Sequence, residues 1–246
     1  AGQRAQIPPG ILAKLTHIFS FDVDFQRDVQ PDDRFAVMYE RLSDEQGERL
    51  GVGNILIADT TNDRVIEVSR DQQVVWTSEG LDLSDGSTLE YTNNAVELPD
   101  RSLLITDRNN DRCLQIDREG NVVWQHAGGL KHPHGAERLE SGNFLIADSD
   151  GNRIVEVDAS GQVVWSYGDG SPEMLSWPRH ARRLPDGKTL IGANAKEGIT
   201  IYTVDRAGKE LSRQVVYPET GSLRVFRLTK EGNFLFTVGK PRSAIE

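Results

Sequence analysis

Short apolar runs alternate with polar clusters along most of this chain. Val, Ile and Leu fill runs of about four to six residues, which are too short for helices, and Asp, Asn and Gly separate them. The pattern predicts strands joined by tight turns. Between residues 136 and 167 it predicts four consecutive strands, at 136–139, 144–148, 154–157 and 163–167, with turns at 141–143, 149–152 and 158–161.

The same sequence motif occurs three times. Residues 54–68, 102–116 and 143–157 share an apolar run that ends in Asp, an Arg five residues later, and a second apolar run. Each copy is followed by Val-Val-Trp, at 74–76, 122–124 and 163–165. The unit spans about forty to fifty residues, which is the length of a propeller blade. Because one four-stranded meander cannot bury both of its faces, several units are expected to pack side by side in a ring.

Weaker copies extend the array. Residues 182–191 and 226–236 restate the opening of a unit, and residues 39–43 resemble 136–140, so we expect them to supply the first strand of the blade that begins at Asn54. We predict an all-β propeller of about five four-stranded antiparallel blades over residues 51–246. Residues 19–25 alternate apolar and polar side chains and are a candidate strand for closing the ring. The alternative is that residues 1–50 form a separate small element.

Two family resemblances accompany these patterns. From about residue 53 to 246, the recurring Leu-Ile-Ala-Asp, Asn-x-Arg and Val-Val-Trp resemble the blades of arylsulfotransferase-like and NHL-type propellers. Residues 15–50, chiefly the stretch from Phe19 to Glu40, resemble the non-catalytic domain that precedes the zinc peptidase domain of murein-type metallopeptidases, without the zinc motifs of the peptidase. The resemblance implies a cell-envelope setting, periplasmic or extracellular, and implies no peptidase activity.

Composition excludes some partners. A net charge of −10 argues against nucleic acid, which needs a basic surface, and no apolar run is long enough to cross a bilayer. We therefore expect a small molecule or a protein as the partner, without membrane insertion. Cys113 is the single cysteine, so it forms no disulfide within the chain. It takes the place of Val65 and Ile154 in the sister units, so we expect a core residue.

Residues that recur in every copy are expected to serve the fold. Each Asp of the repeat precedes its Arg by five residues, as Asp59 precedes Arg64, and we expect the Asp to cap backbone and the Arg to reach a carboxylate. The alternative, a metal or acid–base carboxylate, is less favoured. The recurring tryptophans are expected to pack between blades rather than to form an aromatic cage. These three residues are Trp76, Trp124 and Trp165.

Positions that break the repeat are better candidates for function. Aligning the units on their shared Ala places Asn93, His134 and Arg179 together, and places Asn94, Gly135 and His180 one residue later. These residues open the first strand of each blade, which lines the central channel, so we predict a ligand site at one mouth of the channel. The predicted ligand-binding residues are Asn93, Asn94 and His132.

The arylsulfotransferase resemblance implies a second role for this region. There, a channel histidine attacks the sulfur of an aryl sulfate and passes the sulfuryl group to a phenol. The resemblance implies His180 as the nucleophile, with His134 and Arg179 holding the anion. A departure is Asn93-Asn94 where a third histidine is expected. Ordinary channel-mouth histidines are the competing interpretation, so a binding module is the prediction and the sulfotransferase is the alternative.

A metal site is a further interpretation of Lys131-His-Pro-His134. Two imidazoles two residues apart project to the same side of an extended strand. Zinc or copper needs a third ligand, and His126 or Asp169 reach the pair only if loops fold back. We therefore predict neither a metal nor a cofactor.

Overall fold

The computed structural model describes residues 42–43, 49–51, 54–218, 221–228 and 234–239. All of them belong to the second of two units into which the chain divides, residues 39–246. The candidate closing strand at 19–25 and the peptidase-like segment around Phe19 to Glu40 lie outside the described residues. Apart from two 3-10 turns, η1 (Thr60–Asn62) and η2 (Arg108–Asn110), the described elements are strands.

Three sheets follow the predicted unit, with their strands in chain order. One has three strands and the other two have four. The first is β3 (Ile55–Asp59), β4 (Arg64–Val68) and β5 (Val74–Thr77). The second is β6 (Thr92–Glu97), β7 (Leu103–Asp107), β8 (Arg112–Ile116) and β9 (Val122–His126). The third is β10 (Pro133–Arg138), β11 (Phe144–Asp148), β12 (Arg153–Val157) and β13 (Val163–Tyr167), close to the predicted boundaries.

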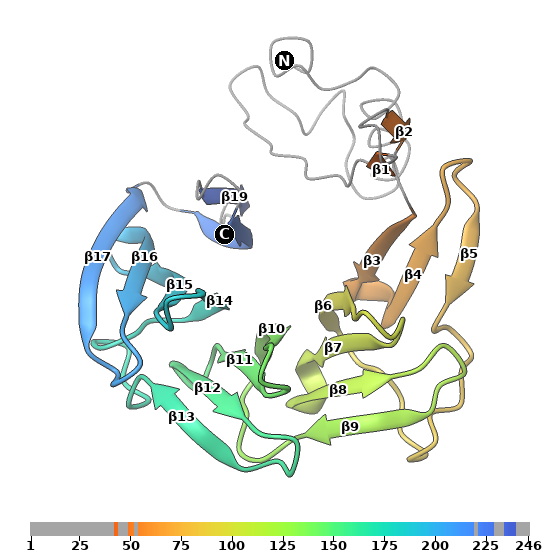
Figure 1. Cartoon of the computed structure of the whole chain (residues 1–246), viewed down its shortest axis with the longest axis horizontal. Coiled ribbons are helices and arrows are strands. Elements are labelled where there is room, and N and C mark those ends of the chain that lie inside the picture. The colour runs from red at the N-terminus through yellow and green to blue at the C-terminus, as the bar shows by residue number, and fades with distance from the viewer. Residues whose placement is uncertain (1–41, 44–48, 52–53, 219–220, 229–233, 240–246) are drawn as a thin grey trace, which may run out of the picture. The chain divides into compact units, whose positions relative to one another are not determined.

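The weaker copies also form sheets. β14 (Pro178–Arg183), β15 (Thr189–Ala195), β16 (Gly198–Val204) and β17 (Glu210–Tyr217) make a fourth antiparallel meander, and β18 (Ser222–Leu228) pairs with β19 (Phe234–Gly239). Figure 1 shows β6, β10 and β14 on the inner side of their sheets. Residues 39–43 were expected to open the first blade, and this expectation is wrong for the part that is described. β1 (Leu42–Ser43) pairs with β2 (Arg49–Gly51) and not with β3. A partner a few residues away costs less loop-closure entropy than a distant one.

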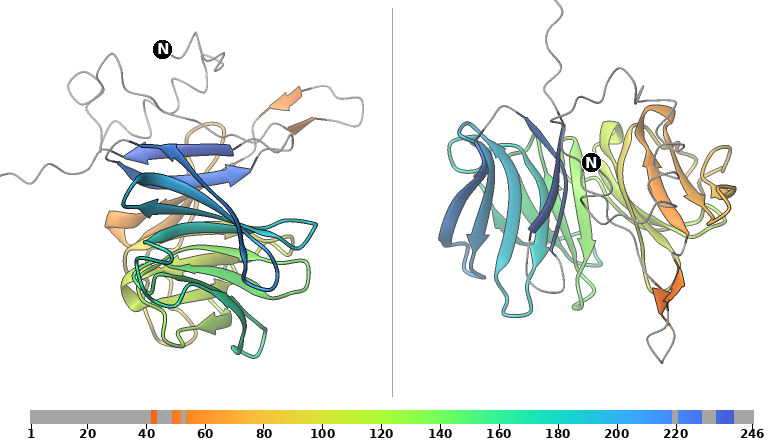
Figure 2. Two further views of the ribbon diagram at one scale, coloured as in Figure 1. Left: turned by 90° about the vertical axis from the view of Figure 1, so that its left-hand side faces the viewer. Right: turned by 90° about the horizontal axis from the view of Figure 1, so that it is seen from above.

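The core lies between neighbouring sheets, which stand side by side in Figure 2. Side chains of β11 alternate: Leu145 and Ala147 pack against the β14–β17 sheet, and Phe144 and Ile146 pack against the β6–β9 sheet. Alternation is the rule for strands. Both faces of the inner sheets are therefore buried, which explains why the central strands are apolar throughout.

The predicted structural residues are confirmed except for the Asp cap. The repeated Asp makes no side-chain cap to its own turn and accepts instead from the backbone of the loop before its sheet, as Asp107 does from Glu90 N–H. The Arg Nε atoms donate to the Asp five residues earlier, at 2.8 Å for Arg64–Asp59 and 2.7 Å for Arg153–Asp148. Trp76 Nε1 donates to Arg118 O of the next sheet at 2.9 Å, so the tryptophan connects blades as predicted. Cys113 is fully buried, and burial raises the pKa of its thiol.

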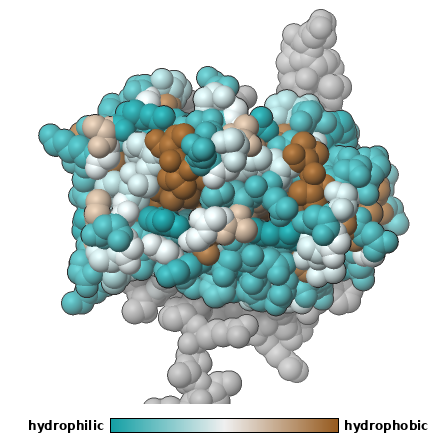
Figure 3. Space-filling view, turned by 90° about the horizontal axis from the view of Figure 1, so that it is seen from below, coloured by the Kyte–Doolittle hydropathy of each residue, from teal (hydrophilic) through white to brown (hydrophobic). Residues whose placement is uncertain are grey.

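The outer strands leave apolar side chains on the surface. Val74, Val123 and Val163 are about half exposed, at 57%, 60% and 48%. Figure 3 shows apolar side chains on one face as separate patches within polar surface. No described helix is long and apolar enough to span a membrane.

Candidate functional site

The inner strands share a β-bulge at one equivalent position. In β10, Pro133 pairs with Asp148 and Gly135 pairs with Ala147, so His134 is the extra residue between them. The same shift leaves Asn93 unpaired in β6 and Arg179 unpaired in β14. The register thus places Asn93, His134 and Arg179 at one position of successive sheets, as the alignment on the shared Ala predicts. A bulge re-aims side chains, which makes these three positions unlike the rest of the strand.

The residue two positions before each bulge has a left-handed backbone. The φ angles are 53° at Tyr91, 46° at His132 and 45° at Trp177, values that are uncommon for residues with side chains. In each case the N–H donates to a side-chain oxygen of the preceding sheet, as His132 N does to Asp111 Oδ1 at 2.7 Å. The other two bonds are Tyr91 N to Asp63 Oδ1 at 2.6 Å and Trp177 N to Asn152 Oδ1 at 3.0 Å. The hydrogen bond between sheets stabilises the strained conformation.

His134 is buried and neutral. Its side chain lies 2.8 Å from Ser149 through Nδ1, and the Ser149 hydroxyl donates to Pro178 O. Since the single hydrogen of the Ser149 hydroxyl goes to that carbonyl, its oxygen accepts from His134 Nδ1–H, which assigns the ring proton to Nδ1. Burial, with the charges of Arg179 and Arg108, lowers the pKa of His134 to about 2.

Arg179 and His180 gather beside His134. Arg179 is 4% exposed, and its guanidinium carbon lies 5.0 Å from the centre of the Trp177 ring. The Trp177 and His134 rings meet edge to face at 5.2 Å. His180 packs on Gly135, where an added Cβ would lie 2.7 Å from His180 Nδ1. The structure therefore brings together His134, Arg179 and His180, the three residues that the resemblance marked as a site.

His132 and His134 contact different side chains. His132 Nδ1 lies 2.5 Å from Asp150 Oδ2, and Trp177 Nε1 donates to the other oxygen of Asp150 at 2.7 Å. Over the residues that the structure describes, no group of three or more His, Cys, Asp and Glu side chains is arranged to hold a metal ion. Asn93 is half-buried, and its Nδ2 has no hydrogen-bond partner in the described part of the chain. Asn94 pairs with Thr106 in the ladder.

One further residue of this series escaped sequence analysis. In β18, Leu223 pairs with Val238 and Val225 pairs with Thr237, which leaves Arg224 at the bulge position. Its unit lacks the Ala that aligned the other copies, since Phe226 stands in its place. The strand pattern of residues 222–228 could have revealed Arg224 if one extra residue for a bulge had been allowed.

We define the mouth cluster as Asn93, Asn94, His132, His134, Arg179 and His180.

Comparisons with known proteins support the fold. No model of a known family matches the chain, and no curated protein sequence matches it. A protein of unknown function from Bacteroides caccae is similar in structure, with a TM-score of 0.57 and 13% identity over 78% of this chain and 69% of that one. A streptogramin B lyase has a TM-score of 0.56 and 13% identity over 80% of this chain and 61% of that one.

The WD40 β-propeller domain of Doa1 is also similar, with a TM-score of 0.54 and 15% identity over 78% of this chain and 62% of that one. The chain thus spans about three fifths of the lyase and Doa1 chains. Identities this low show the fold alone, and that fold is a β-propeller. Neither the arylsulfotransferase or NHL resemblance nor the peptidase resemblance is represented among these structures, so both stay predictions.

Proposed function

We propose that the chain is a β-propeller binding module, of about five blades, whose mouth cluster binds a small anionic molecule. The observation that carries the proposal is the bulge series: Asn93, His134 and Arg179 occupy one equivalent position of three successive sheets and are three different polar residues, although an arginine recurs at Arg224 of the following sheet. Packing demands that recur in every blade produce recurring residues. Polar residues that differ at one buried position therefore favour a ligand as their reason.

The charge of the cluster indicates an anion. The positive charges of Arg179 and Arg108 lie near enough to the His134 ring to disfavour its protonation, so two cationic side chains surround this position. The whole chain carries a net charge of −10, so this local sign opposes the global one. A ring nitrogen, a guanidinium and an amide are suitable donors and acceptors for carboxylate, phosphate or sulfate oxygens.

The location of the protein is a separate part of the proposal. We propose an extracytoplasmic setting, periplasmic or extracellular, on the resemblance of residues 15–50 to a domain of cell-envelope peptidases. Secretion of the natural gene product fused to a reporter that is active only outside the cytoplasm tests it. Reporter activity comparable to that of a cytoplasmic control would contradict this setting.

Calorimetric titration with sulfate, phosphate and 4-nitrophenyl sulfate tests the anion site. We expect saturable binding of at least one anion, weakened about tenfold or more by Arg179→Met, because a charge-assisted hydrogen bond is lost. Arg101→Met is the matched control, since the Arg101 side chain is 72% exposed and lies away from the bulge. Absence of binding, or equal loss in both variants, would contradict an anion site and favour a protein partner.

Sulfuryl transfer is the second candidate, and the state of His134 favours it. A neutral imidazole with Nδ1–H donated to Ser149 carries its lone pair on Nε2, the form that attacks an electrophile. The test is transfer from 4-nitrophenyl sulfate to a phenol by wild type, His180→Ala and His134→Ala, each checked for folding by circular dichroism. Acceptor-dependent turnover that disappears in one folded variant identifies the nucleophile, and turnover that survives in both removes these histidines from the mechanism.

A further inference from the structure

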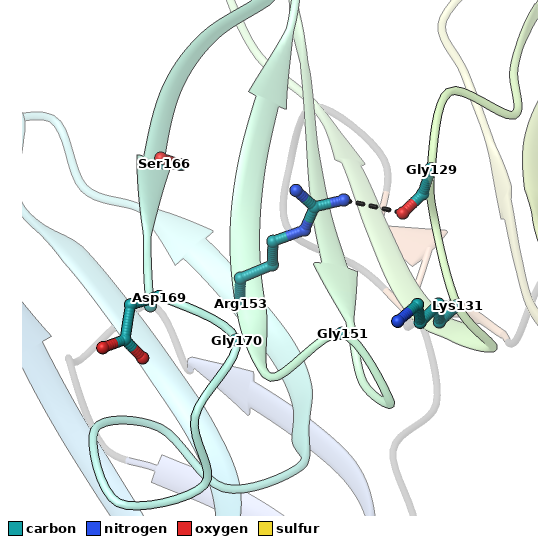
Figure 4. A pocket seen from close by; sticks show the side chains of 8 residues that line it. Gly129, Lys131, Gly151, Arg153, Ser166, Asp169 and Gly170 are labelled. Carbon is teal, nitrogen blue, oxygen red and sulfur yellow. Dashed lines mark hydrogen bonds between the residues drawn. The ribbon is translucent and has the colours of Figure 1, made fainter.

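A cleft lies on the β10–β13 sheet, and none of its lining residues belongs to the mouth cluster. It has a volume of about 310 Å³, at the lower end of the range for small-molecule sites. Its walls come from the loop before β10, the β11–β12 turn, β12, the end of β13 and the loop that follows β13 (Figure 4). We call it the Arg153 cleft, and its lining residues are Gly129, Lys131, Gly151, Arg153, Ser166, Gly168, Asp169 and Gly170.

Most of the wall is backbone. Four of the lining residues are glycines. Two of them are required by packing: an added Cβ would lie 2.2 Å from Asp148 Oδ2 at Gly151 and 2.4 Å from Asn152 O at Gly168. No side chain at these positions can grow into the space, so the cleft stays open and its chemistry is set by the charged residues.

The guanidinium of Arg153 is fixed in the cleft. Nε donates to the fully buried Asp148 at 2.7 Å, and one terminal nitrogen donates to Gly129 O at 2.7 Å. Figure 4 shows this terminal nitrogen directed to Gly129 and the other on the side of Ser166. Within the described residues, Arg153 pairs with no second carboxylate. The group is therefore pre-oriented, with donor capacity left over.

The equivalent arginines of the two preceding sheets have that second carboxylate. Arg64 Nη1 pairs with Glu79, and Arg112 Nη1 pairs with Asp85 Oδ2 at 3.1 Å. Both arginines also bind the Asp that ends the second strand, as Arg153 does. Both carboxylates come from the loop 78–91, Glu79 for the sheet before it and Asp85 for the sheet after it, and both lie beside Nη1. In the described part of the β10–β13 sheet, Arg153 Nη1 has no such partner, since the bond to Gly129 O uses Nη2.

Three differences from the β6–β9 sheet open the Arg153 cleft. The loop that supplies Asp85 has 14 residues (78–91), whereas the corresponding loop before β10 has six (127–132). Ser166 stands where Gln125 reaches Arg112 Nη1 at 3.4 Å. Lys131 is equivalent to Glu90, because the backbone N–H of each donates to the repeated Asp of its own sheet. The changes remove an acid, shorten a side chain and reverse a charge, and each favours an incoming anion.

Asp169 does not fill the position. Its Oδ1 accepts the Ser171 N–H at 2.8 Å, and hydrogen bonds with Ser171 lower the pKa of the Asp169 carboxyl. Figure 4 shows Asp169 turned away from the Arg153 guanidinium. The residue lies at the rim on the side opposite Lys131, where it limits how much negative charge the cleft accepts.

We propose that the Arg153 cleft binds a carboxylate, which takes the position that Glu79 and Asp85 occupy in the sister sheets. Arg153 donates from the nitrogen that lacks an internal acceptor, and Lys131 adds a second positive charge. The ligand is either a free small carboxylic acid or the C-terminus of a peptide. The cleft shares no residue with the mouth cluster, and this proposal does not require the proposed function to be right.

The experiment is a titration of the full chain by NMR, with the Arg153 Nε–H resonance and the Gly168 amide as local reporters. The probes are acetate, N-acetyl-dialanine and the C-terminal amide of that dipeptide, at constant ionic strength. We expect saturable shifts with the two acids, at a Kd of about 1–10 mM, and none with the amide. Equal affinity of the two acids identifies a free-carboxylate site, and much tighter binding of the dipeptide acid identifies a peptide C-terminus.

Variants separate the cleft from general charge effects. Ser166→Glu supplies an internal carboxylate from the Gln125-equivalent position and is expected to weaken acetate binding about tenfold or more, whereas Ser166→Ala leaves it unchanged. Arg153→Lys keeps a cation for Asp148 and loses the planar donor pair, so binding falls and is followed at Gly168. Arg101→Met, which removes an exposed positive charge elsewhere, leaves the shifts intact. Shifts that fail to saturate, that occur equally with the amide, or that persist in Ser166→Glu would overturn the proposal.

Discussion

At the scale of single residues, His134 stands out as a buried imidazole among the described residues. Its side chain is 4% exposed, and burial together with nearby arginines lowers its pKa to about 2. An imidazole in that environment stays neutral in the folded protein at neutral pH and in mild acid. The hydrogen bond to Ser149 then fixes which ring nitrogen carries the proton.

The burial of His134 predicts a loss of stability in mild acid. The unfolded chain protonates this ring near the ordinary pKa of 6.5 and the folded chain does not, so protons favour the unfolded state as pH falls below that value. From pH 7 to pH 5 the contribution of this residue is a loss of about 2 kcal/mol in the free energy of unfolding. Urea unfolding at both pH values measures it. His134→Asn is expected to lose about 2 kcal/mol less between them, and an equal loss in the variant would show that His134 is protonated in the fold.

At the scale of elements, hydrogen bonds from one sheet position the inner strand of the next. Asp111 follows η2 with a φ of 51° and accepts the N–H of His132, whose own φ is 46°. Asn152 makes the same bond to Trp177, so an amide oxygen performs the role as well as a carboxylate. Asp and Asn tolerate the left-handed region better than other residues with side chains.

This equivalence predicts different effects for two substitutions of Asp111. Asp111→Ala removes the hydrogen bond and places Ala in the left-handed region, so we expect a loss of about 2 kcal/mol in the free energy of unfolding. Asp111→Asn keeps both features and is expected to change stability by less than about 0.5 kcal/mol. Chemical denaturation of the two variants measures the difference. Equal destabilisation would mean that the charge, rather than the bond and the backbone, is what matters.

A buried ion cluster joins two other sheets. Glu156 of β12 is 1% exposed and binds Arg183 at 2.7 Å and Arg206, both from the β14–β17 sheet and its turns. Although burial works in the opposite direction, hydrogen bonds from Arg206 and Asn143 hold the pKa of the Glu156 carboxyl below its usual value. The carboxylate is therefore charged near neutral pH and compensates two cations.

Neutralising Glu156 is expected to weaken this junction. Glu156→Gln leaves Arg183, whose side chain is 12% exposed, without its counter-charge, and we expect a loss of about 3 kcal/mol in stability. Glu140→Gln, at an exposed position, is the matched control with little effect. Thermal or urea unfolding of the pair decides the matter. A cost below about 1 kcal/mol for Glu156→Gln would show that the arginines find other partners or water.

At the scale of the whole described unit, each core belongs to two sheets. Leu145 of β11 packs in one cluster with Ile191 of β15 and Tyr202 of β16. A sheet with a neighbour on each side has no complete core of its own. Unfolding of one sheet therefore exposes apolar surface on the next. Stability is therefore expected to be shared along the array.

Leu145→Ala tests this sharing. Loss of a fully buried leucine is expected to cost about 3 kcal/mol. Hydrogen exchange followed by mass spectrometry is expected to show lower protection in β15 and β16 as well as in β11 and β12. Phe144→Ala, which alters the opposite face, is expected to lower protection in β7 and β8 instead. Lower protection confined to the substituted sheet would contradict a shared core.

Sequence alone determined the strands and turns, the repeat and the role of its recurring residues. Short apolar runs such as Phe144–Asp148, and turns rich in Asp, Asn and Gly, follow from preferences that act within a few residues. Alignment of the copies also placed Asn93, His134 and Arg179 at one position. The start of β10 at Pro133 was missed because a bulge interrupts the alternation there.

Only the tertiary structure decided which residues of neighbouring sheets meet. Packing of β10 on β14 puts His180 against Gly135, and the strand that opens the first sheet is not residues 42–43, which pair locally. The open side of Arg153 is likewise invisible in the repeat, since Asp85 reaches the sister Arg112 from a distant loop position. Contacts of this kind depend on loop length and inter-sheet distance. Those quantities are set by packing of the whole array, and no local pattern along the chain specifies them.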